Sequence, residues 1–463
     1  MPRTDPDRSA ALRALPPVDQ ILRLPALASL SRAVLLREAR AWLERQRGEV
    51  LAGRLDAAGV AAACSDAALV ATLTACCRTA ARRRHERVFN ATGIVLHTGI
   101  GRAPLPAAAT QALLDAAGYV VVEVDPRSGE RDQRELGVAA LLTALTGAGG
   151  ALVVNNNAAA TTLMLAALTA GSEVVVSRGE LVEIGGGFRV PDVMRRAGCT
   201  MVEVGATNKT HLRDYTEART DRTVAFLKVH PSNFRIEGFA GTPSVAELVA
   251  ATRASELLVL DDLGSGLLYD GVVPGLVDEP RIADSVAGGA HVTCFSGDKL
   301  LGGPQCGILI GRQDLIARCR RNPLYRALRC DKLTLAALEA TLRIYHDGDP
   351  RREIPTLRLL AAEPAELRER SEALAALLRP LAAEVVGSES FAGSGANPAR
   401  ALPSWAVALP GGDAENDALR AARPVAVFAR VADGRVLLDA RTLLLEDLDA
   451  IAAAVRSAWP HPA

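Results

Sequence analysis

Lysine is rare in this chain, and one of its lysines lies where it could do chemistry. Only four of the 53 Lys and Arg residues are lysines: Lys209, Lys228, Lys299 and Lys332. A lysine that forms a Schiff base attacks an aldehyde as a neutral amine, and arginine, which stays protonated, cannot replace it. Lys299 stands in the Gly-rich sequence SGDKLLGG and is the leading candidate. Lys228, in the strand-like run VAFLKVH, is the alternative.

The residues around Lys299 could also hold a phosphate. Ser296 supplies a hydroxyl, and the glycines Gly297, Gly302 and Gly303 supply backbone amides that no side chain covers. Amides of this kind form anion-binding concavities. The other interpretation is an ordinary surface lysine in a turn, so the neighbouring motifs have to decide between the two.

Two further runs predict a polar group at the carboxyl end of a strand. ELLVLDDLGSG ends in Asp261 and Asp262, and ALVVNNNAAATT passes from an apolar strand through Asn156 and Asn157 to Ala158 and a helix. Ligands of open α/β sheets bind at this edge, and a helix N-terminus suits a phosphate. A pyridinium nitrogen needs a buried carboxylate. With Ser296 and Lys299, these runs predict a pyridoxal phosphate enzyme.

Three arginines could bind an anion. Arg102 lies in HTGIGRAPLP, and Arg326 and Arg329 are three residues apart in a run that predicts a helix, which would place them on one face. Guanidinium groups match phosphate in forked geometry. Surface arginines on an Ala/Leu-rich helix would have the same spacing, so both interpretations stay open.

Composition describes a protein with a substantial core. The chain has 463 residues, 49% hydrophobic and 23% charged, which predicts two or three domains. The N-terminus lacks the apolar segment of a signal peptide, and no apolar run is long enough to span a membrane. The eight cysteines show no CxxC spacing, so we expect reduced thiols, no metal site and a cytoplasmic location.

The hydrophobic pattern predicts three domains. Residues 1–80 show helical periodicity, with Leu35, Ala39, Trp42, Leu43 and Val50 on one face. Residues 81–345 alternate short β-rich runs, among them YVVVEV, with helix-length segments, which is typical of an α/β fold with a mostly parallel central sheet. Residues 346–463 follow a Pro-bearing boundary and predict a smaller α+β domain.

Positive charge gathers at the start of the chain. Residues 1–90 hold 15 Arg against 9 Asp and Glu, and the densest cluster is ARRRHERV at 81–88, whereas the whole chain has a net charge of zero. Such a cluster is either a solvated helix face or a surface that follows the phosphates of a nucleic acid.

The motifs, taken in order, resemble a known family. RVFNATGIVLHTGIGRAPLP, VVNNNAAA, EVGATNKTHLRDY, DLGSG, SGDKLLGGPQCGILIG and PLYRALRCDKLTLAALEATLRIY closely resemble bacterial selenocysteine synthases, the L-seryl-tRNA(Sec) selenium transferases. The resemblance covers nearly the whole chain. It departs at Gly99, where the family usually has Asn, in the loop 129–135, and at Ala429, where a Gly-Arg pair is common.

The resemblance implies a fold-type I pyridoxal phosphate enzyme with a tRNA-binding N-terminal domain, assembled from dimers into a homodecamer. It implies that Lys299 holds the cofactor and that Asp262 rather than Asp261 faces the pyridine nitrogen. For His230 two interpretations stay open: a position over or beside the cofactor, or a core histidine with its hydrogen bonds satisfied. The resemblance also implies that Arg102, Arg326 and Arg329 bind the selenium donor, selenophosphate.

The implied reaction replaces the β-hydroxyl of tRNA-bound serine with selenium. Two alternatives remain at this point. A lyase of the same superfamily acting on a small amino acid would need no basic helical N-terminal domain. A tRNA-binding protein without catalysis would have no need of Lys299 or Asp262.

Overall fold

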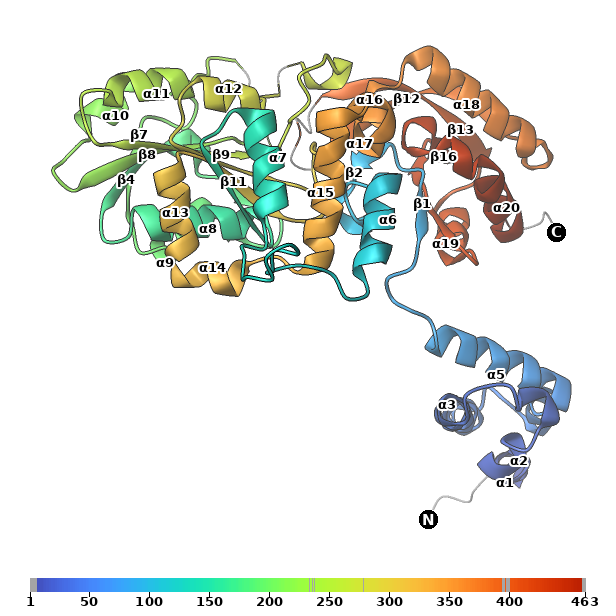
Figure 1. Ribbon diagram of the computed structural model, residues 1–463. Helices are drawn as coiled ribbons and strands as arrows, with labels where there is room; N and C mark the ends of the chain where they lie inside the picture. The colour runs from blue at the N-terminus through green and yellow to red at the C-terminus, as the bar shows by residue number, and fades with distance from the viewer. Residues whose placement is uncertain are drawn as a thin grey trace. The chain divides into compact units, whose positions relative to one another are not determined.

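The computed structural model describes residues 6–232, 234, 236, 238–277, 279–393, 396 and 400–459. The chain divides into two compact units, Met1–Arg87 and Val88–Ala463, which are described separately (Figure 1).

The first unit is helical. Its helices are α1 (Pro6–Arg13), α2 (Val18–Ile21), α3 (Arg32–Leu51), α4 (Ala57–Ala63) and α5 (Asp66–Ala80). The predicted apolar face of α3 is confirmed, because its buried residues are the five that the periodicity indicated. Most of them pack against Leu69, Leu73 and Cys77 of α5 in one core. Ser65 caps α5 by accepting a hydrogen bond from the amide of Ala68.

Within the described residues, no single helix has the length and apolar character to cross a membrane. Helices α4 and α5 meet that criterion only when taken as a pair, and the pair is bent by 64°.

A seven-stranded sheet forms the centre of the second unit (Figure 1). Its order is β3-β11-β10-β9-β8-β4-β7, and every neighbouring pair is parallel except those of β11. The predicted α/β fold with a mostly parallel sheet is therefore confirmed. The strands are β3 (Gly150–Val154), β4 (Glu173–Ser177), β7 (Thr200–Val204), β8 (Thr223–Val229), β9 (Leu258–Gly264), β10 (Val292–Ser296) and β11 (Gly307–Gly311).

Helices cover both faces of this sheet, so its strands are continuous apolar runs. One layer consists of α8 (Asn157–Leu168), α9 (Val190–Arg196), α13 (Gln313–Arg321) and α14 (Pro323–Leu328). The opposite layer consists of α7 (Leu136–Thr146), α10 (Leu212–Glu217), α11 (Val245–Thr252), α12 (Ile282–Ala287) and α15 (Lys332–Asp347), with α6 (Ala107–Ala116) beside α15.

Side chains along β9 alternate between the two layers. Leu258 and Leu260 pack in the core that contains α8, whereas Val259 packs in the core with α11. Because strand side chains point alternately to the two faces, Asp262 faces the α8 layer and Asp261 faces the opposite one.

A second sheet of five strands lies in the C-terminal part. Its order is β15-β16-β13-β12-β2, mainly antiparallel, and β1 pairs with β14 in a separate parallel ribbon. The strands are β1 (Val88–Asn90), β2 (Ile94–Leu96), β12 (Glu384–Gly393), β13 (Ala401–Pro410), β14 (Ala426–Phe428), β15 (Arg430–Ala432) and β16 (Arg435–Asp439). Residues 88–96 thus pair with strands from the far end of the chain.

The remaining elements are short or lie beside this second sheet. They are the two-stranded ribbon β5 (Glu183–Ile184) and β6 (Phe188–Arg189), and the helices α16 (Pro350–Glu353), α17 (Pro355–Ala361), α18 (Pro364–Leu377), α19 (Asp413–Ala421) and α20 (Leu448–Ala458).

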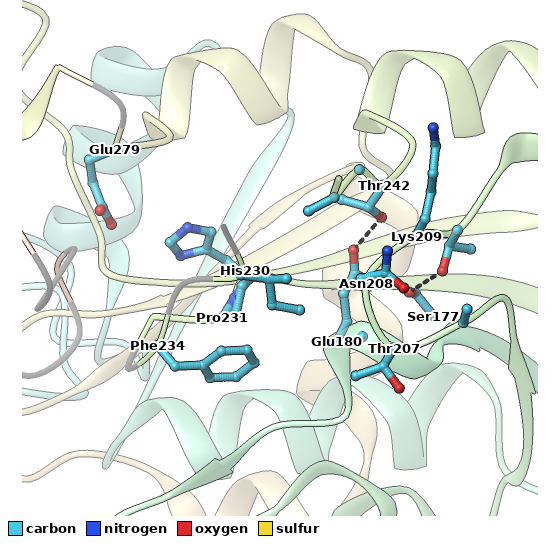
Figure 2. A pocket seen from close by; sticks show the side chains of 16 residues that line it. Ser177, Glu180, Thr207, Asn208, Lys209, His230, Pro231, Phe234, Thr242 and Glu279 are labelled. Carbon is cyan, nitrogen blue, oxygen red and sulfur yellow. Dashed lines mark hydrogen bonds between the residues drawn. The ribbon is translucent and has the colours of Figure 1, made fainter. Parts of the chain in front are cut away.

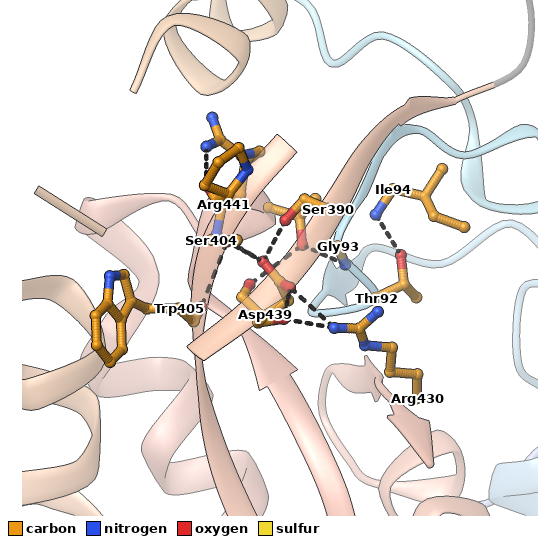
Figure 3. A network of polar contacts seen from close by, with 12 residues as sticks. Thr92, Gly93, Ile94, Ser390, Ser404, Trp405, Arg430, Asp439 and Arg441 are labelled. Atoms are coloured by element: carbon orange, nitrogen blue, oxygen red, sulfur yellow. Dashed lines mark hydrogen bonds and ion pairs between the residues drawn. The ribbon is translucent and has the colours of Figure 1, made fainter. Parts of the chain in front are cut away.

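A fully buried carboxylate joins the strands of the second sheet (Figure 3). Its donors are three serine hydroxyls, one guanidinium and one backbone amide: Ser388, Ser390, Ser404, Arg430 and Arg441, all toward Asp439. Gly93 turns beside it with a φ of +81°, and a Cβ there would lie 2.8 Å from the Asp439 carboxylate. Only glycine permits this approach.

The prediction of a strand at YVVVEV, residues 119–124, is wrong. Only Val124 makes a β-bridge, with Arg131, and Tyr119 and Val121 are exposed. The segment pairs with no sheet in the described part of this chain. Its β-branched residues favour a strand only where a neighbouring strand is available for pairing.

Candidate active site

Asp262 is the buried anion at the centre of the site. Asp262 is only 4% exposed. Its two carboxylate oxygens accept hydrogen bonds of 2.8 Å each, from Asn157 Nδ2 and Thr161 Oγ1. Burial raises the pKa of Asp262, while these two donors and the charge of Lys299 act in the opposite direction. No ion pair neutralises this carboxylate among the described residues.

Helix α8 brings its donors to Asp262 because it begins directly after β3. Asn156 caps the helix by accepting a 2.9 Å hydrogen bond from the amide of Ala159. Gly307 of β11 lies so close that a Cβ would meet the carbonyl oxygen of Asn156 at 2.1 Å. The first-turn amides of Asn157 and Ala158 have no acceptor within the helix, as at any helix start.

Lys299 follows β10 in a tight turn packed against the end of β9. The amide of Leu300 donates to Ser265 at 3.1 Å, and Gly266, with a φ of +73°, approaches Ser296 where a Cβ would clash at 2.5 Å. Lys299 is 6% exposed, and burial, then Arg102, lowers its pKa, with Asp262 opposing. The lowered pKa shifts Lys299 toward the neutral amine that Schiff base formation requires.

The expectation that glycine amides near Lys299 hold a phosphate is wrong. The amides of Gly297, Gly302 and Gly303 donate to the carbonyls of Cys306, Lys299 and Gly297, at 2.9, 3.0 and 2.9 Å. These bonds close the turn and leave no donor for a ligand. Ser296, buried at the end of β10, stays a predicted cofactor contact.

The structure separates Lys228 and Asp261 from the site. Lys228 Nζ donates to Glu180 at 2.5 Å and to Thr242 at 3.2 Å, so this lysine is the partner of a buried carboxylate. Asp261 accepts a 2.5 Å hydrogen bond from Ser285 on the opposite face of the sheet from Asp262, and burial raises the pKa of Asp261 to about 7.

His230 lies at the end of β8, next to Asp262. Its backbone amide donates to the Asp262 carbonyl at 2.9 Å. Burial, with the charges of Lys228 and Lys299, lowers the pKa of His230 to about 4, so the imidazole is neutral near pH 7. Its Nδ1 atom is buried without a hydrogen-bond partner among the described residues.

Arg102 lies against the residue before Lys299. Its Nη1 donates to Asp298 Oδ2 at 2.7 Å, and the amide of Ala103 donates to the Asp298 carbonyl at 3.3 Å. Arg102 has a φ of +58°, an uncommon conformation for a residue with a side chain. Two elements far apart in sequence are thereby fixed together around Lys299.

The argument that Arg326 and Arg329 share a helical face is wrong, because α14 ends at Leu328 and Arg329 is extended. Arg329 instead makes a β-bridge with Val154, and the amide of Asn155 donates to Leu328 at 2.9 Å. Arg329 is therefore placed at the end of β3, beside the start of α8, whereas Arg326 is exposed on α14.

Sequence reasoning missed Glu123. Its carboxylate is shared by Arg131 at 3.1 Å, Arg329 at 3.4 Å and, more closely, Arg134. Arg134, the strongest influence, and Arg131 lower the pKa of Glu123, so it stays ionised. Arg134 also donates to the carbonyl of Cys330 at 2.8 Å. The only signal in the sequence is the alternation of acids and arginines over residues 123–134.

These residues fit pyridoxal phosphate. Asp262 is a buried carboxylate without a cationic partner, which a protonated pyridine nitrogen would complete. Besides His230 Nδ1, the Oδ1 atom of Asn157 is also buried without a hydrogen-bond partner. Lys299 supplies the amine from the neighbouring turn. In the described residues, no group of three or more His, Cys, Asp or Glu could hold a metal ion.

Asp262→Asn should weaken binding of pyridoxal phosphate about 10- to 100-fold, because a charge-assisted hydrogen bond to the cofactor is lost. Binding is measured by titrating the apoprotein and following cofactor absorbance. Asp261→Asn is the matched control, one residue away on the other face, and should bind as the parent does. Equal losses in both variants would contradict the assignment of Asp262.

Comparisons with known proteins show the family to which this chain is similar. The family model described as L-seryl-tRNA selenium transferase matches residues 88–444. The chain is 47% identical to the L-seryl-tRNA(Sec) selenium transferase of Solidesulfovibrio magneticus, over 96% of this chain and 98% of that protein. It is 46% identical to the enzyme of that name from Moorella thermoacetica, over 96% of each.

Among solved structures, D-glucosaminate-6-phosphate ammonia-lyase is similar with a TM-score of 0.58 and 23% identity, covering 81% of this chain and 95% of that one. This likeness concerns the fold. The family match and the near full-length identity establish that this chain belongs to the L-seryl-tRNA selenium transferase family.

Proposed function

We propose that this enzyme converts L-seryl-tRNA(Sec) to L-selenocysteinyl-tRNA(Sec), with selenophosphate as the selenium donor. The names of its relatives supply the reaction. The observation that carries the proposal is the buried Lys299, in a turn packed against the end of the strand that holds Asp262, with Arg102 paired to the neighbouring Asp298. The net reaction exchanges the serine β-hydroxyl for selenium: the Cβ–O and Se–P bonds break, and Cβ–Se and P–O bonds form.

Pyridoxal phosphate would be held by Lys299 and Asp262, with Ser296, His230, Asn156, Asn157 and the amide of Ala158 as further contacts. When bound, this cofactor supplies an electron sink for bond cleavage at the serine Cα. Asp262 would keep the pyridine nitrogen of the bound cofactor protonated, because it is a buried carboxylate to which no cation is bonded among the described residues.

Lys299 is the base for the serine Cα proton. Its burial and its lowered pKa favour the free amine, so a proton can be taken up at Nζ. The closed turn around it, with all three glycine amides already bonded, fixes the backbone from which the side chain reaches. Neutral His230 next to Asp262 adds no positive charge that would compete for this carboxylate.

Arg102, Arg326 and Arg329 form the anion site for selenophosphate. Arg102 and Arg329 are already paired with Asp298 and Glu123, so both side chains are oriented before an anion arrives. The third, Arg326, is exposed. Guanidinium groups from two directions would hold a phosphate-like donor near the serine Cβ.

The N-terminal domain, residues 1–80 with the arginine cluster that follows, binds the tRNA. Arg83 and Arg84 are exposed, whereas Arg82 is paired with Glu86 at 2.5 Å. Exposed guanidinium groups gain affinity for nucleic acid by neutralising phosphates. Residues 81–345 form the catalytic domain and residues 346–463 a smaller domain in this proposal.

We further propose that the chain forms a homo-oligomer in the cytoplasm, a homodecamer built from dimers. The exposed apolar residues Leu114, Tyr119 and Val121 support assembly, since a monomer gains nothing from leaving them in water.

Lys299→Arg should abolish formation of selenocysteine from serine-labelled tRNA(Sec) and selenophosphate, by at least about 10²-fold, because arginine can act neither as nucleophile nor as base. The amino acid is released by ester hydrolysis and identified by chromatography. Lys228→Arg is the matched control and should keep activity, since arginine can still pair with Glu180. Label that stays serine with the parent enzyme would contradict the proposed function.

Arg329→Gln should raise the KM for selenophosphate about tenfold or more, because one charged hydrogen bond to the donor is lost. Steady-state kinetics measure this, with the exposed Arg321→Gln as control. Cofactor absorbance should not change. Loss of pyridoxal phosphate in Arg329→Gln would show that this arginine supports the cofactor instead of the donor.

Reversing two charges, Arg83→Glu with Arg84→Glu, should weaken tRNA(Sec) binding and lower the slope of log Kd against log salt by about 2, one for each lost phosphate contact. The matched control is Arg195→Glu with Arg196→Glu, two exposed neighbouring arginines in the other unit. An unchanged slope in the first variant would exclude these arginines from the tRNA surface.

A further inference from the structure

A cavity of about 340 Å³ opens at the carboxyl edge of the central sheet, next to the proposed active site (Figure 2). The ends of three parallel strands line it. They contribute Ser177 at the end of β4 with Glu180 after it, Thr207 and Asn208 after β7, and His230 and Phe234 after β8. Small-molecule sites have volumes of about 300–1,000 Å³, so this cavity suits one compact ligand.

Two acidic residues line the cavity, and one of them, Glu180, is already neutralised. Glu180 accepts hydrogen bonds from Lys228 at 2.5 Å, from Thr242 at 2.7 Å and from the amide of Val229 at 3.0 Å. Ser177 and Thr210 bond to each other at 2.7 Å. The Glu180 carboxylate is therefore not available to a cationic ligand, and this part of the wall suits an uncharged group.

One wall presents a fixed amide. Asn208 Nδ2 donates to the carbonyl of Phe239 at 2.5 Å, and its backbone carbonyl accepts from Gly241 at 3.0 Å. Lys209 bridges to Gly241, and its Nζ lies 4.0 Å from the centre of the Phe239 ring. The amide orientation is thus set, and Asn208 Oδ1 remains as an acceptor for an N–H group of a ligand.

The facing wall is aromatic and apolar. Phe234, Pro231 and Ile236 line it, and Figure 2 shows the Phe234 ring directed across the cavity toward Glu180 and Thr207. A flat apolar ring opposite a polar amide is the arrangement that accepts a nucleobase, because any base has a face to stack and an edge to hydrogen-bond.

The cavity reaches the reacting end of the substrate through His230 and Glu279. Both residues line it, and both lie close enough to Lys299 for their charges to interact. In seryl-tRNA the serine is esterified to the ribose of the last nucleotide. A serine at Lys299 would therefore place that ribose at His230 and its base beyond it.

We propose that this cavity binds the 3′-terminal adenosine of the aminoacyl-tRNA, with the base stacked on Phe234 and its amino group donating to Asn208. The inference rests on the proposed function and adds a subsite to it. The subsite explains why the enzyme would bind seryl-tRNA more tightly than free serine. Free serine has no adenosine and makes no contact with the cavity.

The experiment uses full-length, cofactor-loaded enzyme and a non-hydrolysable probe, 3′-(L-serylamino)-3′-deoxyadenosine, as an inhibitor of selenocysteinyl-tRNA formation. The second probe carries the same serylamino ribose without a base. The adenosine probe should inhibit at least about fivefold more tightly than the abasic one, from stacking of one base. Equal inhibition by the two probes would overturn the proposal.

Phe234→Ala should raise the inhibition constant of the adenosine probe at least about fivefold and leave that of the abasic probe unchanged. Val272→Ala is the control, because Val272 is also an exposed apolar residue, 77% exposed, and does not line the cavity. Unchanged cofactor absorbance establishes that each variant is folded. Equal effects of the two substitutions would also overturn the proposal.

Calorimetry of adenosine binding separates this inference from the proposed function. Adenosine that binds to the parent and not to Phe234→Ala would support the cavity even if the parent made no selenocysteine. Conversely, selenocysteine formation by a parent that does not distinguish the two probes would keep the proposed function and overturn the subsite.

Discussion

The pair of hydrogen bonds that Asn157 and Thr161 donate to Asp262 is the constraint around which the site is arranged. A buried carboxylate costs several kcal/mol unless donors surround it, so β9 and the start of α8 have to stay in register. That register in turn fixes the end of β3, where Arg329 bridges to Val154, and the amide of His230 against the Asp262 carbonyl. The Asp262 carboxylate thus fixes the positions of the ends of β3, β8 and β9 relative to one another.

The arginines of the candidate site are also held by specific polar partners. Arg102 is paired with Asp298, and Arg329 shares Glu123 with two other arginines. Each guanidinium is held in place by a carboxylate before any donor binds, which lowers the entropy lost on binding. If the arginines bind the donor as proposed, the anion would share them with the two acids, and its affinity would depend on Glu123 and Asp298 as well as on the arginine charges.

The sequence predicted what short-range pattern controls. Continuous apolar runs indicated the buried strands, and Asn156 at a strand end indicated the start of α8. Both signals lie within a few neighbouring residues of the sequence. The sequence-based predictions were wrong where the structure of a segment depends on residues that are distant in sequence or on where a helix ends. The amides of Gly302 and Gly303 were already bonded across the turn, Arg329 followed a helix that ended one residue earlier, and residues 119–124 had β-rich composition without a neighbouring strand. Glu123 was missed because its link to the site is Arg329, which is distant in sequence.

The contact of Gly93 with Asp439 and Thr442 also sets the order in which the chain can be completed. The hydrogen bond from Gly93 to Thr442 spans 349 residues. A ribosome adding about 5–20 residues per second needs roughly 20–70 s to synthesise that stretch. During this time β1 and β2 have left the ribosome without the strands that pair with them. Strands β12 and β14, which are translated much later, therefore complete the pairing of β2 and β1, and a chain that stops before them leaves β1 and β2 without these partners.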